Sequence, residues 1–95
     1  MATNGDVTRM AQGFSAAVAR FPQAGFTIRR LMRTRDEFLD LCADLADAER
    51  AFADAEKMPP PLREDRQREW QELIDRLIAE IDAVLKQCER NGPTP

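Results

Sequence analysis

The sequence contains no histidine, and this absence limits its chemistry more than any other feature. Without imidazole the chain lacks the commonest general base and cannot form the Ser-His or Cys-His pairs that activate nucleophiles. Mixed Cys/His zinc sites and the Glu-x-x-His pairs of di-iron bundles are excluded for the same reason. There is also no P-loop, dinucleotide glycine signature or Cys-x-x-Cys pair. The sequence therefore predicts a protein that is not an enzyme and holds no cofactor.

Cysteine is scarce as well, because Cys42 and Cys88 are the only two. They are too few for a disulfide framework. In the helical hairpin predicted below, residues whose numbers sum to about 119 face each other, which places the thiols roughly 16 Å apart along it. A disulfide needs Cα atoms within about 7 Å, so we expect no intrachain bridge. Two reduced, buried thiols are the expectation, and they suit the cytoplasm.

No apolar run approaches the roughly 20 residues of a membrane span. Two targeting interpretations of the start of the chain stay open. Met10 to Ala19 is weakly apolar and ends in Ala17-Val18-Ala19, which is similar to a signal-peptidase site, and residues 1–35 have the amphipathic, arginine-rich character of a transit peptide. The default expectation is a cytoplasmic protein that keeps its N-terminus and has no membrane partner.

The residues that are abundant favour helix. The chain is 43% hydrophobic and 33% charged, and its 95 residues allow a single domain. A first helical stripe runs through Val7, Met10, Ala11, Phe14, Val18 and Phe21, and Pro22 ends it. Gly13 weakens this helix by up to about 1 kcal/mol relative to alanine, so we expect the helix to depend on docking.

Two long helices are predicted next, from Thr34 to about Lys57 and from about Leu62 to Arg90. Their apolar positions alternate at spacings of three and four: Phe38, Leu41, Leu45, Ala48, Phe52 and Ala55, then Trp70, Ile74, Leu77, Ile81, Val84 and Cys88. Thr34 and Glu37 match a capping box that would open the first of them. The three prolines 59–61 end it and form a turn.

The predicted fold class is therefore all-α, an antiparallel helical hairpin (residues 26–95) preceded by an amphipathic helix and link (residues 1–25). Leu73, Ile78 and Leu85 widen the last stripe beyond what one partner helix covers. If these side chains stayed exposed, each would lose about 1.5–3 kcal/mol of the stabilisation that burial provides. The cover is the N-terminal helix, which gives a three-helix bundle, or a second copy, which gives a dimeric bundle, or a different protein.

Charge is divided unevenly along the chain. Residues 1–35 hold six arginines against one aspartate, a net of +5, and the remainder holds eight basic against sixteen acidic residues, a net of −8. The densest basic segment contains Arg29, Arg30, Arg33 and Arg35, which could bind phosphates or an acidic protein. The alternative is a solvated face, or pairing with the chain's own acidic half. No aromatic residue is interleaved with these arginines, and the pI is about 4.9, so nucleic acid is the less favoured partner.

Asp40, Asp44 and Asp47 form an acidic ridge at spacings of four and three. Carboxylates attract Mg²⁺ or Ca²⁺, but a rigid helix face rarely converges enough oxygen atoms, so we expect no metal site. A metal-dependent hydrolase built on this ridge is the weakest of the functional hypotheses.

One resemblance supports the hairpin. Its elements are the segment Ile28-Arg29-Arg30-Leu31-Met32, the helix opening Asp36-Glu37-Phe38-Leu39-Asp40-Leu41, and the return helix with Leu77-Ile78-Ala79-Glu80-Ile81. In these features residues 28–87 resemble the YdcH-type small bacterial helical hairpins. The chain departs from that family in lacking histidine, in its proline turn and in its additional N-terminal helix. The family has no established activity, so the resemblance implies the hairpin and no function.

The leading functional hypothesis is a non-enzymatic protein–protein interaction module that acts through helix–helix contacts, as a homodimer or with a partner helix. Its candidate surface is the stripe with Leu73, Ile78 and Leu85. The rival hypothesis is a nucleic-acid or phosphate-binding accessory protein that uses the arginines between positions 29 and 35.

Overall fold

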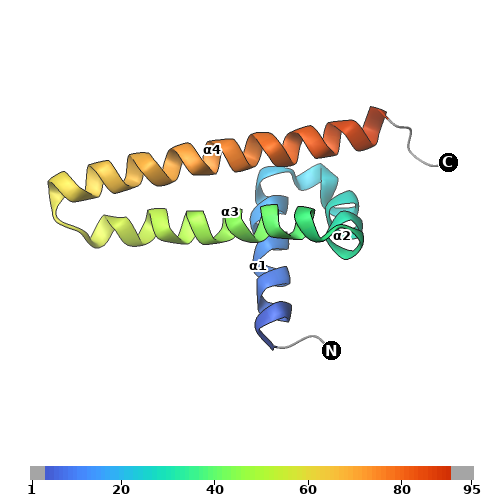
Figure 1. Ribbon diagram of the computed structural model, residues 1–95, viewed down its shortest axis with the longest axis horizontal. Coiled ribbons are helices and arrows are strands. Elements are labelled where there is room, and N and C mark those ends of the chain that lie inside the picture. Colours follow the sequence, from blue (N-terminus) through green and yellow to red (C-terminus); the bar gives the residue numbers. More distant parts are fainter. Residues whose placement is uncertain (1–3, 91–95) are drawn as a thin grey trace.

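The computed structural model describes residues 4–90, and over that range the chain is an all-α helical bundle, as predicted (Figure 1). Its elements are α1 (Asn4–Arg20), the short 3-10 helix η1 (Pro22–Ala24), α2 (Gly25–Thr34), α3 (Asp36–Asp54), a second 3-10 helix η2 (Ala55–Lys57) and α4 (Pro60–Arg90). The helices α3 and α4 form the predicted antiparallel hairpin. In Figure 1, α1 crosses α3 instead of running beside it, and α2 lies at the end of the hairpin opposite the turn.

The hairpin turn follows from its prolines. Met58 takes an extended backbone, φ −81° and ψ 158°, as expected for a residue that precedes proline. Pro60 is the first residue of α4, where a missing N–H leaves no hydrogen bond unmade. Across the hairpin, the Gln67 side-chain amide donates to the Phe52 carbonyl at 3.4 Å. These two numbers sum to 119, so this contact agrees with the predicted register.

The crossing of α1 over α3 depends on small side chains. A Cβ atom on Gly13 would lie 2.9 Å from the backbone nitrogen of Ala43, which is closer than packed atoms allow. Ala16 and Ala17 are buried further along the same side of α1. Helix axes approach closely only where the side chains between them are this small. Gly13 therefore marks the point of closest approach of the two helices and is not simply a weak position in α1.

The predicted capping box is absent. Thr34 is the last residue of α2, and its hydroxyl donates to the Arg30 carbonyl at 3.0 Å instead of capping α3. Arg35 is extended, joins the two helices and occupies the N-cap position of α3, with no side-chain cap hydrogen bond. The local motif failed because α2 continues helically through Thr34, which gives its hydroxyl an acceptor one turn back.

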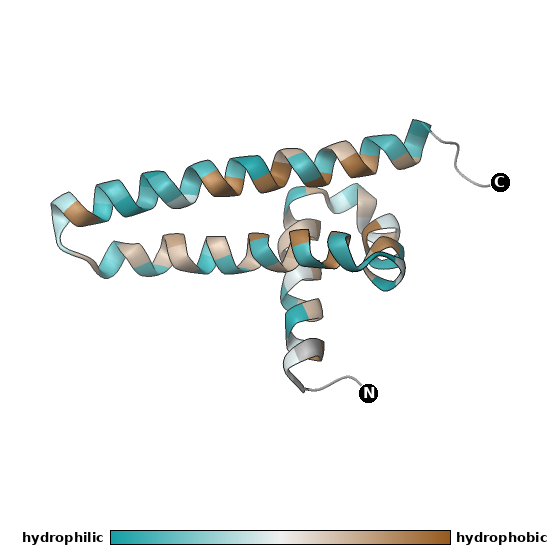
Figure 2. Cartoon of the chain, in the orientation of Figure 1, coloured by the Kyte–Doolittle hydropathy of each residue, from teal (hydrophilic) through white to brown (hydrophobic). Residues whose placement is uncertain are grey.

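The core lies where all four helices meet, away from the turn. Its largest fully buried side chains are Phe38, Ile28, Leu45, Ile81 and Cys42. Between Pro60 and Leu73, in contrast, α4 carries no buried side chain. Figure 2 shows the same division, since the hydrophobic positions of α4 lie toward α3 and gather in its second half. The first half of α4 and the end of α3 thus extend from the core as a two-helix arm.

This arm makes the molecule elongated, with principal extents of 53 × 32 × 19 Å. The radius of gyration is 14.9 Å, whereas a compact domain of this length has about 12.4 Å.

Candidate interaction surfaces

The structure separates the three hydrophobic residues that the sequence grouped together. Leu73 and Ile78 are five residues apart, which puts them about 140° apart around α4. Leu85 is 7% exposed, belongs to the buried core and borders the hollow between α4 and the segment formed by η1 and α2, on the side of α4 that Ile78 shares. Leu73 and Ile78 are half-buried. The grouping was therefore wrong in geometry, and one of its members, Leu85, is already covered within the chain.

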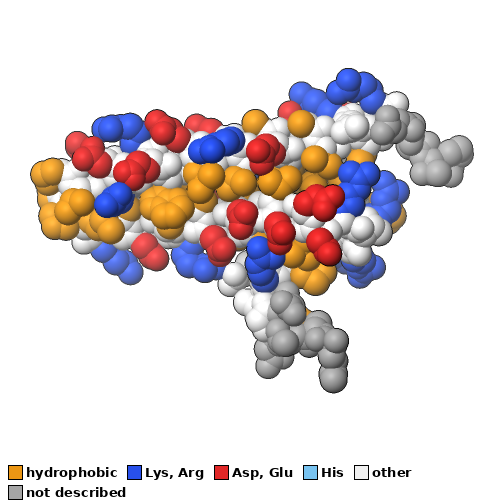
Figure 3. All heavy atoms as spheres, viewed as in Figure 1, with side chains coloured by type: hydrophobic (Ala, Val, Ile, Leu, Met, Phe, Trp, Pro, Cys, Tyr) orange, Lys and Arg blue, Asp and Glu red, His pale blue; other side chains and the backbone are white. Residues whose placement is uncertain are grey.

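A different set of apolar residues shares the uncovered side of the hairpin. Val84 lies within about 20° of Leu73 around α4, on the side away from Leu85. On α3, Leu41 lies about 160° around the helix from Ala43, where α1 crosses. We call the surface marked by Leu41, Leu73 and Val84 the hairpin face. In Figure 3, hydrophobic side chains follow the line between α3 and α4 on this side, with acidic side chains along α3.

The six arginines of the N-terminal third divide into two groups. Arg9 lies 3.0 Å from the Asp40 carboxylate, and Arg20 lies 2.7 Å from that of Glu49, so both fasten α1 to α3. Pairing with the acidic half thus involves Arg9 and Arg20, and not the arginines at positions 29–35 for which the sequence suggests it. Arg29, Arg30, Arg33 and Arg35 are exposed, and none of them forms an ion pair with any side chain that the structure describes.

The arginine segment also contains an aromatic residue that the sequence analysis missed. Phe26 is 81% exposed, the most exposed of the large hydrophobic side chains described. It precedes Arg29, Arg30 and Arg33 by three, four and seven residues, so all four share one side of α2. We call this side the arginine face. The helical spacing of Phe26 predicts this arrangement, although no aromatic residue lies between the arginines themselves. Arg35 lies in the link after α2 and is not part of this face.

An apolar groove of about 360 Å³ lies between α1 and α2, next to the arginine face. It is lined by Val7, Met10, Ala11, Phe14 and Met32, with Arg29 and Arg33 at its edge. The Arg29 guanidinium lies over the Phe14 ring, 4.7 Å from its centroid. A cation–π contact of this kind holds the guanidinium at the edge of the groove. We call this feature the α1–α2 groove.

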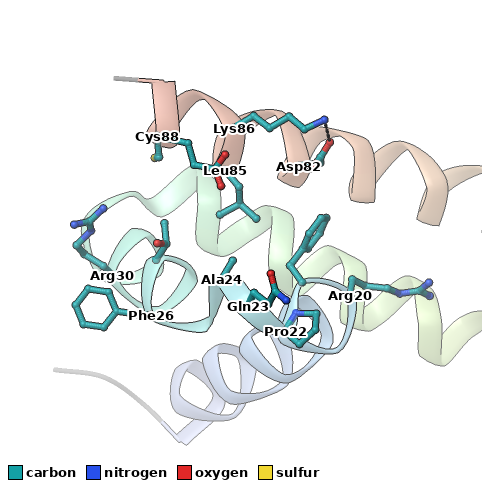
Figure 4. A pocket seen from close by; sticks show the side chains of 13 residues that line it. Arg20, Pro22, Gln23, Ala24, Phe26, Arg30, Asp82, Leu85, Lys86 and Cys88 are labelled. Carbon is teal, nitrogen blue, oxygen red and sulfur yellow. Dashed lines mark ion pairs between the residues drawn. The ribbon is translucent and has the colours of Figure 1, made fainter. Parts of the chain in front are cut away.

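A second hollow, of about 790 Å³, lies between η1, α2 and the end of α4 (Figure 4). Its walls carry both signs of charge. Arg20 pairs with Glu49, and Lys86 lies 3.1 Å from the Asp82 carboxylate. Phe26 and Arg30 stand next to each other on α2 at one edge. Because most of its charged groups are already paired, this hollow favours no particular ligand.

The acidic ridge on α3 is occupied by arginines. Arg9 reaches Asp40 and also lies 3.8 Å from Asp44, while Arg50 lies 3.6 Å from Asp47. Among residues 4–90, no three His, Cys, Asp or Glu side chains converge as metal ligands would. The ridge therefore anchors α1 and does not present a set of free carboxylates.

Both thiols are unpaired. Cys42 is fully buried beneath the point where α1 crosses α3, and this burial raises its pKa from 9.0 to about 12. A thiol with such a pKa stays protonated and unreactive at neutral pH. Cys42 is thus a core residue.

Known proteins give no further guide. Comparison with protein-family models, curated proteins and solved structures finds no match to this chain. The resemblance to YdcH-type hairpins therefore stays a prediction. In the part of the chain from residue 4 to residue 90, no helix has both the length and the apolar character needed to cross a membrane.

Proposed function

We propose that this protein is a non-enzymatic interaction module, and that it self-associates by packing the hairpin face of one copy against the hairpin face of another. The observation that carries the proposal is the side of the hairpin opposite α1. There Leu41, Leu73 and Val84 pack at the edge of the core and stay only half-buried. Burial of such side chains is the main driving force for protein association.

The surface area supports a second copy as the cover. The chain exposes 6714 Å², whereas a folded monomer of this mass exposes roughly 5,500 Å². This surplus of roughly 1,200 Å² belongs to the whole elongated chain, and it leaves area for an interface of standard size, in which each partner loses about 800 Å². An interface on the hairpin face would bury part of this surplus.

The shape of the face also suits self-association. Two antiparallel hairpins stacked face to face make a four-helix arrangement, in which every long helix gains an apolar neighbour. A two-fold axis makes such an interface close on itself, so that association stops at the dimer. We place this dimer in the cytoplasm, where its two unpaired thiols would stay reduced.

Light scattering tests the proposal. The wild-type protein should show twice the chain mass of 10.8 kDa, at low and at high salt, because apolar contact is not screened by ions. The variant Leu73→Lys/Val84→Lys should be monomeric, since two ammonium groups would have to be buried between the copies. Lysine can extend its charge into water in the monomer, so the helical circular dichroism spectrum should be kept.

The matched control is Ala79→Lys/Ala83→Lys, which adds the same charge at two exposed positions elsewhere on α4. It should remain a dimer. A wild-type protein that is monomeric up to its solubility limit would overturn the proposal, and so would a control that dissociates as readily as the hairpin-face variant.

A further inference from the structure

We propose that the α1–α2 groove and the adjoining arginine face form a docking site for an acidic amphipathic helix of another protein. This surface belongs to α1 and α2, whereas the hairpin face belongs to α3 and α4. Docking of an acidic helix on α1 and α2 therefore involves a second class of partner and does not require self-association. It stands on three observations, which are the charge state of α2, the apolar lining of the groove and the exposure of Phe26.

The charges of α2 lack a counterpart. The helix contains Arg29, Arg30 and Arg33 and no acidic residue. Elsewhere in the described chain, six cationic side chains each lie within 4 Å of a carboxylate: Arg9, Arg20, Arg50, Arg66, Arg68 and Lys86. Among the described side chains five others form no such pair, but they are spread along the chain and not gathered on one helix face: Arg35, Lys57, Arg63, Arg76 and Arg90. Guanidinium groups bind carboxylates with two parallel hydrogen bonds, so a row of them selects an acidic partner.

The groove supplies the apolar half of the recognition. Val7 is 57% exposed at its rim, and Met10, which is only half-buried, contributes a flexible side chain that adapts to different shapes. Met32 forms the buried floor of the groove. Arg29 is fixed at the edge by its contact with Phe14, and Arg33 follows it by one turn on the same side of α2. Apolar lining and guanidinium groups thus lie side by side, which matches a ligand that carries apolar and anionic groups side by side.

A helix presents this alternation in the simplest way. Apolar side chains at i, i+3, i+4 and i+7 enter a groove while acidic side chains flank it. From Val7 to Phe14 the groove follows two turns of α1, about 10 Å at 1.5 Å rise per residue. About two turns of a partner helix fit that length. Phe26, one turn before these arginines on the same side of α2, offers the exposed aromatic anchor that often dominates such contacts.

Nucleic acid and lipid fit these observations less well. A phosphodiester backbone has nothing apolar to place in the groove. A membrane surface requires a continuous apolar area. The exposed large hydrophobic residues instead lie on separate elements, with Val7 on α1, Phe26 on α2, and Met58 and Leu62 at the hairpin turn.

The test uses designed, fluorescently labelled helical peptides and the full chain, with binding measured by anisotropy. The first peptide has leucine at i, i+3, i+4 and i+7 and glutamate beside them. The second replaces glutamate with lysine, and the third replaces leucine with serine. The glutamate peptide should bind, and each of the other two should bind at least about tenfold more weakly.

Charge reversal on the protein makes the test reciprocal. Arg29→Glu/Arg33→Glu should lose at least about tenfold in affinity for the glutamate peptide and should gain affinity for the lysine peptide. Arg68→Glu/Arg76→Glu changes the net charge equally at exposed positions of α4 and should leave binding unchanged. Both variants should keep the oligomeric state of the wild type, so failure of this inference is separate from failure of self-association.

Several outcomes would overturn the proposal. One is equal binding of the glutamate and lysine peptides, and another is an equal effect of the two charge-reversed variants. A single-stranded RNA oligonucleotide, or vesicles containing anionic lipid, that bind the wild type more tightly than the glutamate peptide would assign the arginine face to that class of partner instead.

Discussion

Gly13 of α1 lies directly against the backbone of Ala43 in α3, so the two helices touch without any side chain between them at this point. The contact sits above the fully buried Cys42. Here α1 is fastened to the hairpin by packing as well as by ion pairs, and the packing leaves no space for a methyl group.

The first prediction concerns this contact. Gly13→Ala should destabilise the protein, although alanine is the better helix former by up to about 1 kcal/mol. The added Cβ would lie 2.9 Å from the Ala43 nitrogen and 3.0 Å from the Cys42 carbonyl carbon, and neither backbone atom can move freely. Overpacking of this kind costs about 1–3 kcal/mol, which corresponds to a fall of several degrees in melting temperature.

Gly25→Ala is the control for that substitution. Gly25 begins α2 in right-handed helical geometry, and its added Cβ would meet only the Val18 side chain, at 3.9 Å. This variant should be neutral or more stable by about 0.4–1 kcal/mol, because alanine restricts the unfolded chain. The melting temperature should therefore fall in Gly13→Ala and stay the same or rise in Gly25→Ala. A Gly13→Ala protein as stable as Gly25→Ala would mean that α1 does not cross α3 at this point.

Apolar periodicity predicts the helical hairpin but not the position of α1. The apolar spacing gave the long helices and their pairing, because every third or fourth residue must face the partner. It could not give the crossing of α1, since a stripe shows which side of a helix is buried and not what covers it. Periodicity alone therefore marks Gly13 as a weak point in a helix, whereas its close contact with Ala43 is a property of the tertiary structure.

The candidate surfaces were predictable in part. The four arginines are exposed, and helical spacing predicts that Phe26 shares one side of α2 with Arg29, Arg30 and Arg33. Leu73 and Ile78 were grouped by hydrophobicity, although their separation of five residues places them on different sides of a helix. The burial of Leu85 depends on its place in the core shared by all four helices, a tertiary arrangement that no local pattern encodes.

The second prediction concerns thiol reactivity. Cys42 is fully buried and Cys88 is half-buried at the second hollow. In the native protein at pH 8, Ellman's reagent should titrate one thiol readily and the other only after denaturation. The slow thiol should disappear in Cys42→Ala and persist in Cys88→Ala. Two thiols of equal, rapid reactivity would contradict the burial of Cys42.

The third prediction follows from the same burial. Because the pKa of Cys42 is about 12 in the folded protein and near 9.0 in the unfolded chain, the folded state keeps a proton that the unfolded state loses between these values. The free energy of unfolding should therefore decrease as pH rises through this window, by up to about 1.4 kcal/mol per pH unit. Below pH 9 this stabilisation is fully present. The free energy of unfolding, obtained from urea titrations at several pH values across this window, should fall less steeply with pH for Cys42→Ala than for Cys88→Ala.

The fourth prediction concerns the ion pair that fastens the end of α1. Arg20 donates two hydrogen bonds to one Glu49 carboxylate oxygen, at 2.7 and 3.1 Å. Both side chains are partly exposed, at 43% and 32%, so their coupling should be about 0.5–1 kcal/mol in a double-mutant cycle with alanine. The coupling should shrink as salt is raised toward 1 M. A value that does not change with salt would mean that Arg20 acts through packing instead of charge.

The last prediction uses Trp70 as a reporter of the hairpin face. It is the only tryptophan, it is half-buried, and it lies three residues before Leu73 on α4. If two hairpin faces pack together, acrylamide quenching of its fluorescence should weaken as the protein concentration rises through the dissociation constant of the dimer. The monomeric variant Leu73→Lys/Val84→Lys should show quenching that is strong and independent of concentration. A wild-type dimer whose Trp70 stays equally accessible at all concentrations would place the dimer contact on another surface of the chain.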